Sequence, residues 1–238
     1  MAETVGPALR EEARALNWIH EEVRAGRPLP ALEAHAVSQA VGLALRQVGP
    51  GQRPHTGDGA VTGPLVSHSL NAALAAGVFA TALSLEPQVV ASLVMAALLA
   101  DIGQARTGFD PLMGGRPSPE EWEKVRRHPV EGARVLMQAG TPFELPAVVA
   151  YEHHQNLDGS GYPERVVKRV PHFASRLVRI ADVFTAMTEA RPWRSSPHDP
   201  EAAIAQMASE AGNAYDVELM NAFTNVFQKV PAVALPVE

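Results

Sequence analysis

Helical periodicity runs through almost the whole chain, and it constrains the fold more than any other feature. Apolar residues recur every three or four positions in successive segments, whereas the alternating patterns of half-buried strands are hard to find. Proline stands in the first turn of several segments, where its missing N–H costs nothing. The expected helices are residues 11–25, 32–48, 68–85, 87–101, 119–138, 142–153, 172–189, 200–211 and 217–230. The sequence therefore predicts an all-α fold.

A stretch rich in helix breakers divides this pattern. Residues 49–63 contain five glycines and Pro54, a composition typical of a flexible loop or linker. We therefore expect a small helical N-terminal region with its linker at residues 1–60. A bundle of about seven helices is expected to follow at residues 61–238.

Composition narrows the classes of function. The 238 residues carry a formal net charge of −6, which argues against broad binding to a nucleic acid polymer or an anionic membrane. The chain has no cysteine, so a transition metal would have to be held by His and carboxylate ligands. The N-terminus lacks the apolar core of a secretory signal, and the longest apolar run, residues 89–100, is well short of the ~20 residues that span a bilayer. We expect a soluble cytoplasmic protein with no membrane span.

The segment HHQNLDGSGYP, residues 153–163, is the clearest indication of a functional site. It combines two adjacent histidines with a carboxylate and a Gly-rich turn, which can bring metal ligands and a substrate loop together. A polar surface turn with two incidental histidines is the plain alternative.

Other candidate ligands lie at the ends or faces of separate helices: His68, Asp101, His128 and Asp182. Taken singly, each histidine has an ordinary role as a half-buried side chain with a backbone partner, and Asp101 has one as a turn residue. Asp182 stands among apolar residues, so it is either on the solvent face or a buried carboxylate beside a cation. Only a bundle whose helices converge could gather the four.

The order and spacing of several motifs resemble the HD-GYP family, a branch of the HD superfamily of metal-dependent phosphohydrolases. The resemblance covers residues 66–227, and the segment EEVRAGRPLP is similar to one that precedes this domain in some members. The matching motifs are HSLN at 68–71, DIG at 101–103, SPEEWEKVRRHPVEGARVL at 118–136, HHQNLDGSGYP at 153–163, RIADVFTAM at 179–187, ARPWR at 190–194 and AGNAYDVELMNAF at 211–223.

The resemblance implies an HD-superfamily helical bundle in which iron or manganese ions hydrolyse the phosphodiester of cyclic di-GMP. Neighbouring metals lower the pKa of a bridging water and neutralise charge on the phosphate. By the family pattern, Asp101 bridges two metals as the catalytic carboxylate. The ligands implied for one sphere are His128, His153 and His154, and for the other His68 and Asp182. The residues implied to contact the substrate are Gly161, Tyr162, Arg191 and Arg194.

The chain departs from the family pattern at several positions. Ala100 stands where the namesake histidine is expected, and alanine offers no donor atom. Gln104 replaces a lysine near the substrate phosphates, Thr185 replaces an acid, and Pro64 stands where another acid is usual. Since even a supporting residue can be worth about 10–100-fold in metal affinity, we expect one or two ions, with reduced occupancy next to Ala100.

Three functions stay open on this basis. The first is a degenerate member that binds metal and cyclic di-GMP, has weak or no phosphodiesterase activity, and signals through contacts with a protein partner. The second is an active metal-dependent cyclic di-GMP phosphodiesterase, and the third is a metal-free helical interaction module. The departures at Ala100, Gln104 and Thr185 favour the first, because function depends on the site rather than on the fold.

Overall fold

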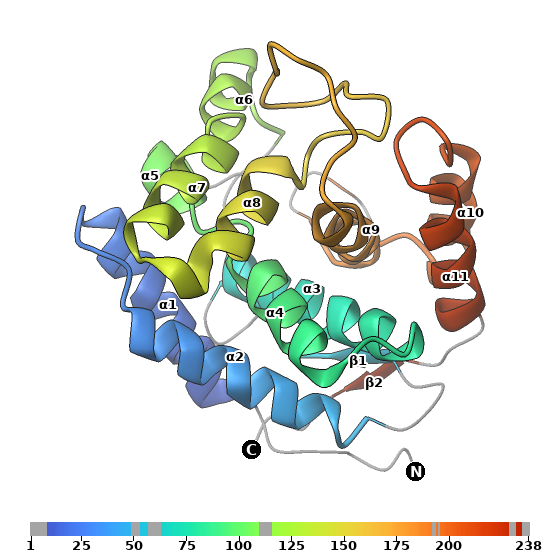
Figure 1. The fold of residues 1–238 in the computed structure, drawn as a ribbon, viewed down its shortest axis with the longest axis horizontal. Helices are drawn as coiled ribbons and strands as arrows, with labels where there is room; N and C mark the ends of the chain where they lie inside the picture. Colours follow the sequence, from blue (N-terminus) through green and yellow to red (C-terminus); the bar gives the residue numbers. More distant parts are fainter. Residues whose placement is uncertain are drawn as a thin grey trace.

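The computed structural model describes residues 9–48, 53–56, 63–109, 116–191, 194, 196–228 and 232–234. These described residues form eleven α-helices, one 3-10 helix and two short strands (Figure 1). The first half contains α1 (Arg10–Arg24), α2 (Ala31–Leu45), β1 (Arg53–His55), α3 (Pro64–Ala82), α4 (Pro87–Leu99), α5 (Gln104–Thr107) and α6 (Pro119–Val125). The second half contains α7 (His128–Gln138), η1 (Thr141–Phe143), α8 (Glu144–Glu152), α9 (Phe173–Thr188), α10 (Pro200–Ser209), α11 (Val217–Phe227) and β2 (Ala232–Ala234).

The predicted all-α class is confirmed, but the single helix predicted at 119–138 is wrong. The structure breaks it into α6 and α7, and α7 begins at His128 with proline in its first turn. Pro129 has no N–H, and inside a helix its ring would clash with the carbonyl of Val125, four residues earlier. Together with the short α5, this break raises the predicted seven helices after residue 61 to nine within the described residues.

A small parallel sheet joins segments from the two ends of the chain. Strand β1 pairs with β2 in the register Arg53 with Ala232 and His55 with Ala234. The stretch 49–63 was predicted as a loop throughout, which is wrong for residues 53–55, and most of the remaining stretch lies outside the described residues. Strands of three residues, one of them containing a proline, carry no alternation by which the sequence could reveal them.

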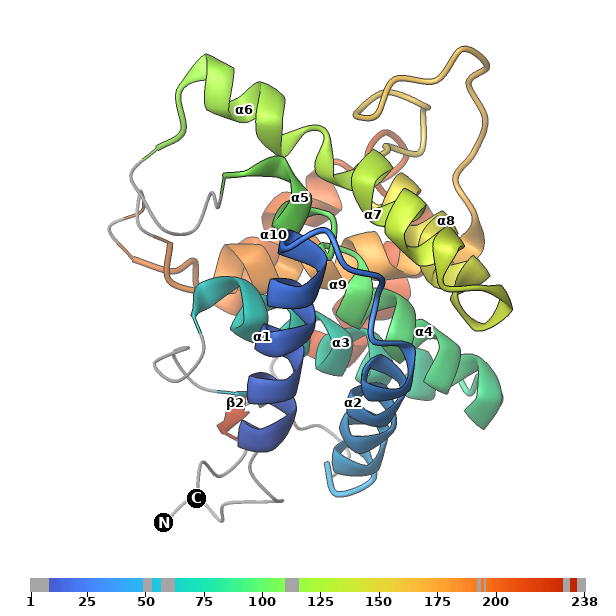
Figure 2. The same ribbon diagram turned by 90° about the vertical axis from the view of Figure 1, so that its left-hand side faces the viewer.

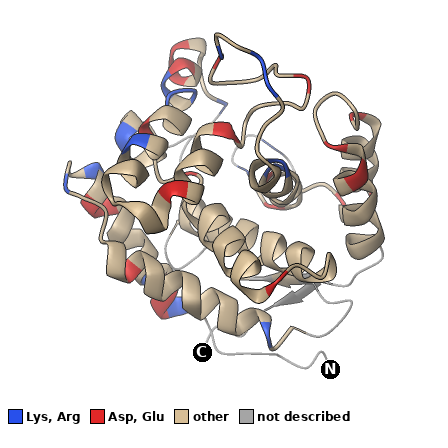
Figure 3. Ribbon diagram, viewed as in Figure 1, with Lys and Arg blue, Asp and Glu red and all other residues tan. Residues whose placement is uncertain are grey.

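The centre of the bundle is formed by α3 and α4, which lie side by side (Figure 1). Neither helix contains a charged residue other than histidine, and Figure 3 shows the charged positions mainly on the helices around them. By length and composition, Pro64–Ala82 and Pro87–Thr107 would each be apolar enough to cross a membrane. Most of both segments is buried in the protein, so their apolar character is explained by the core of the fold.

Helices α1 and α2 pack on this centre and share its hydrophobic core (Figure 2). The apolar face of α1, with Leu16, Ile19 and Val23, is fully buried. Burying a Leu or Ile side chain stabilises a fold by about 1.5–3 kcal/mol, so the N-terminal helices contribute substantially to stability. The predicted domain boundary near residue 60 falls outside the described residues and stays a prediction.

Candidate metal centre

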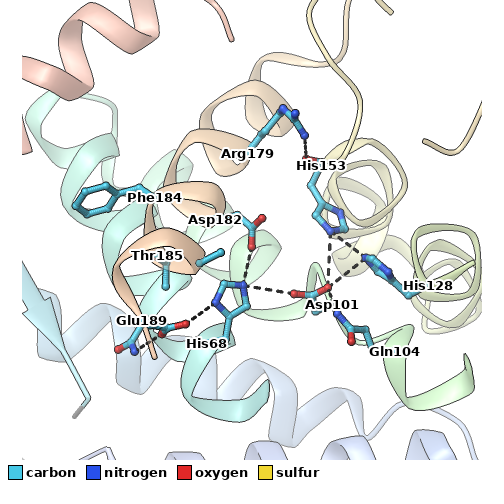
Figure 4. A network of polar contacts seen from close by, with 12 residues as sticks. His68, Asp101, Gln104, His128, His153, Arg179, Asp182, Phe184, Thr185 and Glu189 are labelled. Carbon is cyan, nitrogen blue, oxygen red and sulfur yellow. Dashed lines mark hydrogen bonds and ion pairs between the residues drawn. The ribbon is translucent and has the colours of Figure 1, made fainter. Parts of the chain in front are cut away.

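The fold brings six predicted ligands from the ends or faces of five helices to one place. Five of them are labelled in Figure 4: His68, Asp101, His128, His153 and Asp182. His68 lies on α3, Asp101 in the turn after α4, and Asp182 on α9. The remaining three are His128 at the start of α7 and His153 and His154 at the end of α8. Their donor atoms form two groups, Asp101 with His128, His153 and His154, and Asp101 with His68 and Asp182. Asp101 belongs to both groups, although the roles of the six as ligands stay predictions.

In the first group, backbone carbonyls fix the orientation of two rings. His128 Nδ1 lies 2.6 Å from the carbonyl oxygen of Val125, and His153 Nδ1 lies 2.9 Å from that of Ala150. A carbonyl only accepts, so each Nδ1 carries the proton and each Nε2 presents a lone pair. The Val125 carbonyl is available because Pro129 cannot bond to it. The helix break that the sequence prediction missed therefore positions a candidate ligand.

The lone pairs of this group converge. His128 Nε2 and His153 Nε2 are 3.2 Å apart. Asp101 Oδ1 lies 3.2 Å from His128 Nε2 and 3.8 Å from His153 Nε2. Three lone pairs facing one point repel one another, and a cation between them relieves the repulsion.

The protonation states of the first group suit metal ligands. Burial would raise the pKa of Asp101, but the neighbouring imidazoles of His153, His128 and His68 hold it well below its ordinary value. Burial lowers the pKa of His128 to about 4 and holds that of His154 well below its usual range. Burial would also lower the pKa of His153, but Asp101 raises it, so a metal would compete with a proton there.

The second group is centred on His68, whose two ring nitrogens both face carboxylates. Nε2 lies 2.8 Å from Asp182 Oδ1 and 3.7 Å from Asp101 Oδ2, while Nδ1 lies 2.9 Å from Glu189 Oε2. Burial would lower the pKa of His68, but the charge of Glu189 and the hydrogen bonds to Asp182 and Glu189 raise it to about 10. A carboxylate on Nδ1 is the usual partner of a metal-binding histidine, because it orients Nε2 toward the ion.

The departures from the family pattern lie around the shared carboxylate Asp101 and the second group. Ala100 is buried at the C-terminal end of α4 and provides no ligand beside Asp101. The Gln104 amide donates a hydrogen bond of 2.8 Å to Asp101 Oδ1, so it occupies one lone pair of the shared carboxylate. Thr185 is buried on α9, one turn after Asp182. The second group therefore has three candidate protein ligands, and the first has four.

The loop that carries Gly161, Tyr162 and Pro163, here called the GYP loop, returns to the first group through a tight turn. Gly161 has a φ of +91°, and a Cβ there would lie 2.3 Å from the carbonyl oxygen of His154, so only glycine fits. The ring of Tyr162 consequently stacks on that of His154, with 4.6 Å between centroids. Tyr162 thus borders the predicted metal position, as expected for a residue that contacts the substrate.

The two predicted phosphate-binding arginines are partly committed to contacts within the protein. Arg191 Nη2 lies 3.1 Å from His68 Nδ1 and 3.4 Å from Glu189 Oε2, at the edge of the second group. Arg194 donates to the carbonyls of Ala186 and Met187 near the end of α9, which is a common way to satisfy the last carbonyls of a helix. Arg191 is therefore the better placed of the two to reach a ligand.

Sequence reasoning missed two acids that support the site, the buried Glu152 and the partly buried Glu189. Glu189 accepts hydrogen bonds from His68 and, at 2.6 Å, from the Asn71 amide. Glu152 accepts from Arg165, from the backbone N–H of His172 and from the Ser175 hydroxyl. Asn71 was a usable signal for Glu189, because a polar side chain in the otherwise apolar helix α3 needs a hydrogen-bonding partner inside the protein.

Comparison with known proteins identifies the family. The model of the HD domain family matches residues 59–219. The chain belongs to the HD domain family. A cyclic di-GMP phosphodiesterase of Thermotoga maritima is 33% identical over 60% of this chain, and the cyclic di-GMP phosphodiesterase response regulator RpfG of Xanthomonas campestris is 32% identical over 62%. With the GYP loop, these similarities place this HD domain in the HD-GYP branch, as the motifs predicted.

The match covers only part of these relatives. It spans 39% of the length of each of those two phosphodiesterases. A 3'3'-cGAMP-specific phosphodiesterase 1 of Vibrio cholerae is 34% identical over 48% of this HD domain chain and 26% of its own length. Among solved structures, Bd1817, an HDG"Y"P protein from Bdellovibrio bacteriovorus, has a TM-score of 0.66 at 14% identity, covering 91% of this chain and 69% of that one. This last likeness concerns the HD fold alone.

HD domains depend on metal, and the residues of this one fit a metal ion. The fit rests on the three converging lone pairs of Asp101, His128 and His153. Backbone carbonyls hold the Nδ1 atoms of the two histidines, which leaves Nε2 of each for the ion. Nitrogen and carboxylate ligands together suit iron, manganese or zinc.

Proposed function

We propose that this chain is a degenerate HD-GYP protein that binds one metal ion firmly, binds cyclic di-GMP, and has weak or no phosphodiesterase activity. The observation that carries the proposal is the contrast between the two groups around Asp101. The first has four candidate ligands with converging lone pairs, while the second has three and adjoins Ala100. Bound iron or manganese would lower the pKa of a coordinated water and neutralise charge on the phosphate.

The chain's own residues would divide the work as follows. His128 and His153 hold the ion through nitrogens oriented by backbone carbonyls. Tyr162, whose ring stacks on that of His154, would lie beside the ion and the nucleotide phosphate. Arg191, at the edge of the second group, offers a guanidinium to that phosphate. The positions of these side chains support the proposal that ligand binding is retained.

Weak catalysis follows from the second group. Without a histidine at position 100, an ion held by His68, Asp101 and Asp182 has one protein ligand fewer than the family pattern supplies. Gln104 contributes an amide where the pattern has a cation, so charge developing on the attacked phosphate is less stabilised.

Signalling through protein contacts has some support on the surface. Val166, Val167 and Val170 are exposed on the loop between the GYP motif and α9. Exposed apolar side chains gathered on one loop are a common feature of protein-binding surfaces.

The test is metal analysis together with a hydrolysis assay on protein purified anaerobically with iron(II) or manganese. We expect about one ion per chain, binding of cyclic di-GMP, and turnover far below that of intact relatives. His153→Ala should abolish metal binding, Asp182→Ala should leave most of it, and His35→Ala, an exposed histidine on α2, is the control.

Two other outcomes would contradict the proposal. Two ions per chain and robust turnover that His153→Ala abolishes would establish the active phosphodiesterase. The intact His68–Glu189 pair, which orients a ligand of the second group, is the observation that favours this alternative. Absence of metal under both conditions would leave the helical interaction module.

A further inference from the structure

A cavity of about 500 Å³ lies between the N-terminal helix α1 and the candidate metal centre. Its walls come from α1, the first turn of α3 and the short helix α5, which meet beside the turn that carries Asp101 (Figure 2). The volume falls within the range of about 300–1,000 Å³ that is usual for small-molecule sites. The cavity is therefore large enough for part of a nucleotide.

His20 on α1 is the first group that marks this cavity as a site. The side chain lines the cavity and is 2% exposed. Neither ring nitrogen has a hydrogen-bond partner within the described part of the chain. Burial lowers its pKa to about 4, so at neutral pH the ring has one donor and one acceptor nitrogen. Leaving such a group unsatisfied costs free energy, which a ligand with both kinds of partner would recover.

Gln104 is the second such group, and it connects the cavity to the metal centre. Its amide nitrogen donates to Asp101 Oδ1, which leaves the amide oxygen as an acceptor. That oxygen is buried and has no partner among the described residues, although the side chain lines the cavity. One amide thus contacts the shared metal ligand on one side and the cavity on the other.

The remaining walls combine apolar surface with free backbone donors. Leu65, Val66, Ala105 and Phe109 supply apolar area. Leu65 and Val66 belong to the first turn of α3, and no side chain of the described residues caps this helix, so its first N–H groups are open. Apolar walls combined with both donors and acceptors suit a heteroaromatic ring.

The alternatives fit less well. Arg24 also lines the cavity and would attract a phosphate, but the unpartnered Gln104 oxygen and the nearby charge of Asp101 would repel one. A metal ion would face the open N–H groups of α3, whose partial charge is positive. A purine has donors for Gln104 and acceptors for His20, and its ring can lie against Leu65 and Phe109.

We propose that this cavity binds the purine base of a nucleotide whose phosphate lies at the metal centre, with His20 and Gln104 contacting the edge of the base. This inference rests on the proposed function in that it takes a nucleotide as the ligand of the centre. It adds that α1, a helix outside the residues matched by the family model, forms part of the nucleotide site.

The test uses nucleosides, which lack the phosphate and so report on the cavity independently of the metal. Guanosine and adenosine are titrated into the ¹⁵N-histidine-labelled full chain after chelation, and the His20 ring signals, assigned by their loss in His20→Gln, are followed by NMR. We expect saturable shifts of these signals at about 0.1–1 mM nucleoside, while the exposed His35 stays unchanged. The tighter of the two nucleosides identifies the base.

The proposal is overturned if the His20 signals do not move, or if all histidine signals move together. A failure of metal binding or of hydrolysis would instead count against the proposed function and leave this result unaffected.

A second measurement does not depend on substituting a buried residue. Asn17, on the partly exposed face of α1, lines the cavity, so Asn17→Phe should obstruct it without disturbing the core. In the manganese-loaded protein we expect guanosine monophosphate to bind about tenfold more weakly to this variant, because the base loses its contacts. Glu11→Phe places the same ring on an exposed position of α1 as the matched control, and ribose 5-phosphate should bind all three proteins equally. Equal binding of guanosine monophosphate to all three would refute the proposal.

Discussion

Glu152 should be among the most important single residues for stability, although it is not a predicted ligand. Its side chain is 3% exposed and accepts hydrogen bonds from Arg165, from the His172 backbone at 2.7 Å and from the Ser175 hydroxyl at 2.8 Å. Glu152 ends α8, while two of these partners lie at the start of α9. One carboxylate therefore ties together both ends of the loop that carries the GYP motif.

The expected loss of stability in Glu152→Ala follows from what the substitution leaves behind. The side chain of Arg165 is 8% exposed, so its charge would stay buried without a partner. Breaking a buried ion pair in this way costs about 3–5 kcal/mol. For 238 residues, the entropy of unfolding corresponds to about 0.5 kcal/mol per degree, so Tm should fall by about 6–10 °C.

Urea unfolding followed by circular dichroism measures this loss. Glu152→Gln should lose less than Glu152→Ala, because it keeps acceptors for His172 and Ser175. The double variant Glu152→Leu, Arg165→Met should recover much of the loss, since apolar replacement of a buried pair is often neutral. Glu131→Ala breaks the exposed pair with Arg134 and should cost no more than about 1 kcal/mol. A loss equally small for Glu152→Ala would refute the reasoning.

Three further predictions concern the metal centre. Gly103→Ala should lower the free energy of unfolding by at least about 3 kcal/mol in urea, because the added Cβ would lie 2.0 Å from the His128 carbonyl oxygen. Gly42→Ala is the control and should not lower it, because the added Cβ would meet no atom within 4 Å. Manganese at 100 times its Kd should stabilise by about 2.7 kcal/mol in thermal unfolding, and an equal effect on His153→Ala would contradict the first ligand group. Ala100→His should raise metal content toward two ions per chain; a lower Tm with unchanged metal would show that apolar packing fills the gap.

The sequence predicts helices well here because their stability follows from local patterns. The apolar face of α1 and the capping box of α6, in which Ser118 and Glu121 exchange hydrogen bonds, are both present in the structure. The break between α6 and α7 was predictable in principle. Pro129 has no N–H to donate to the Val125 carbonyl, and inside a helix its ring would clash with that carbonyl. Strands β1 and β2 were not, because their pairing joins residues nearly two hundred positions apart.

The convergence of the six candidate ligands came from the family resemblance, not from their spacing. Spacing alone leaves His68 and Asp182 unrelated, whereas the structure places His68 Nε2 2.8 Å from Asp182 Oδ1. The supporting acids Glu189 and Glu152 escaped prediction because nothing in the local sequence distinguishes an acid that faces the interior at the end of a helix from an exposed one. His20 escaped for the related reason that its neighbours Leu16 and Val23 mark only an apolar face.

The position of Gln104 links the loss of the usual lysine to the presence of α1. A lysine at this position would bring a positive charge next to the first turn of α3 and to His20. Burial in this cavity lowers the pKa of His20 to about 4, so the histidine is neutral at pH 7. A neutral amide instead satisfies Asp101 and leaves an acceptor facing that cavity. Under the proposed function, Gln104 would weaken charge stabilisation at the phosphate and would give a base a polar edge to contact, as expected of a site retained for binding more than for turnover.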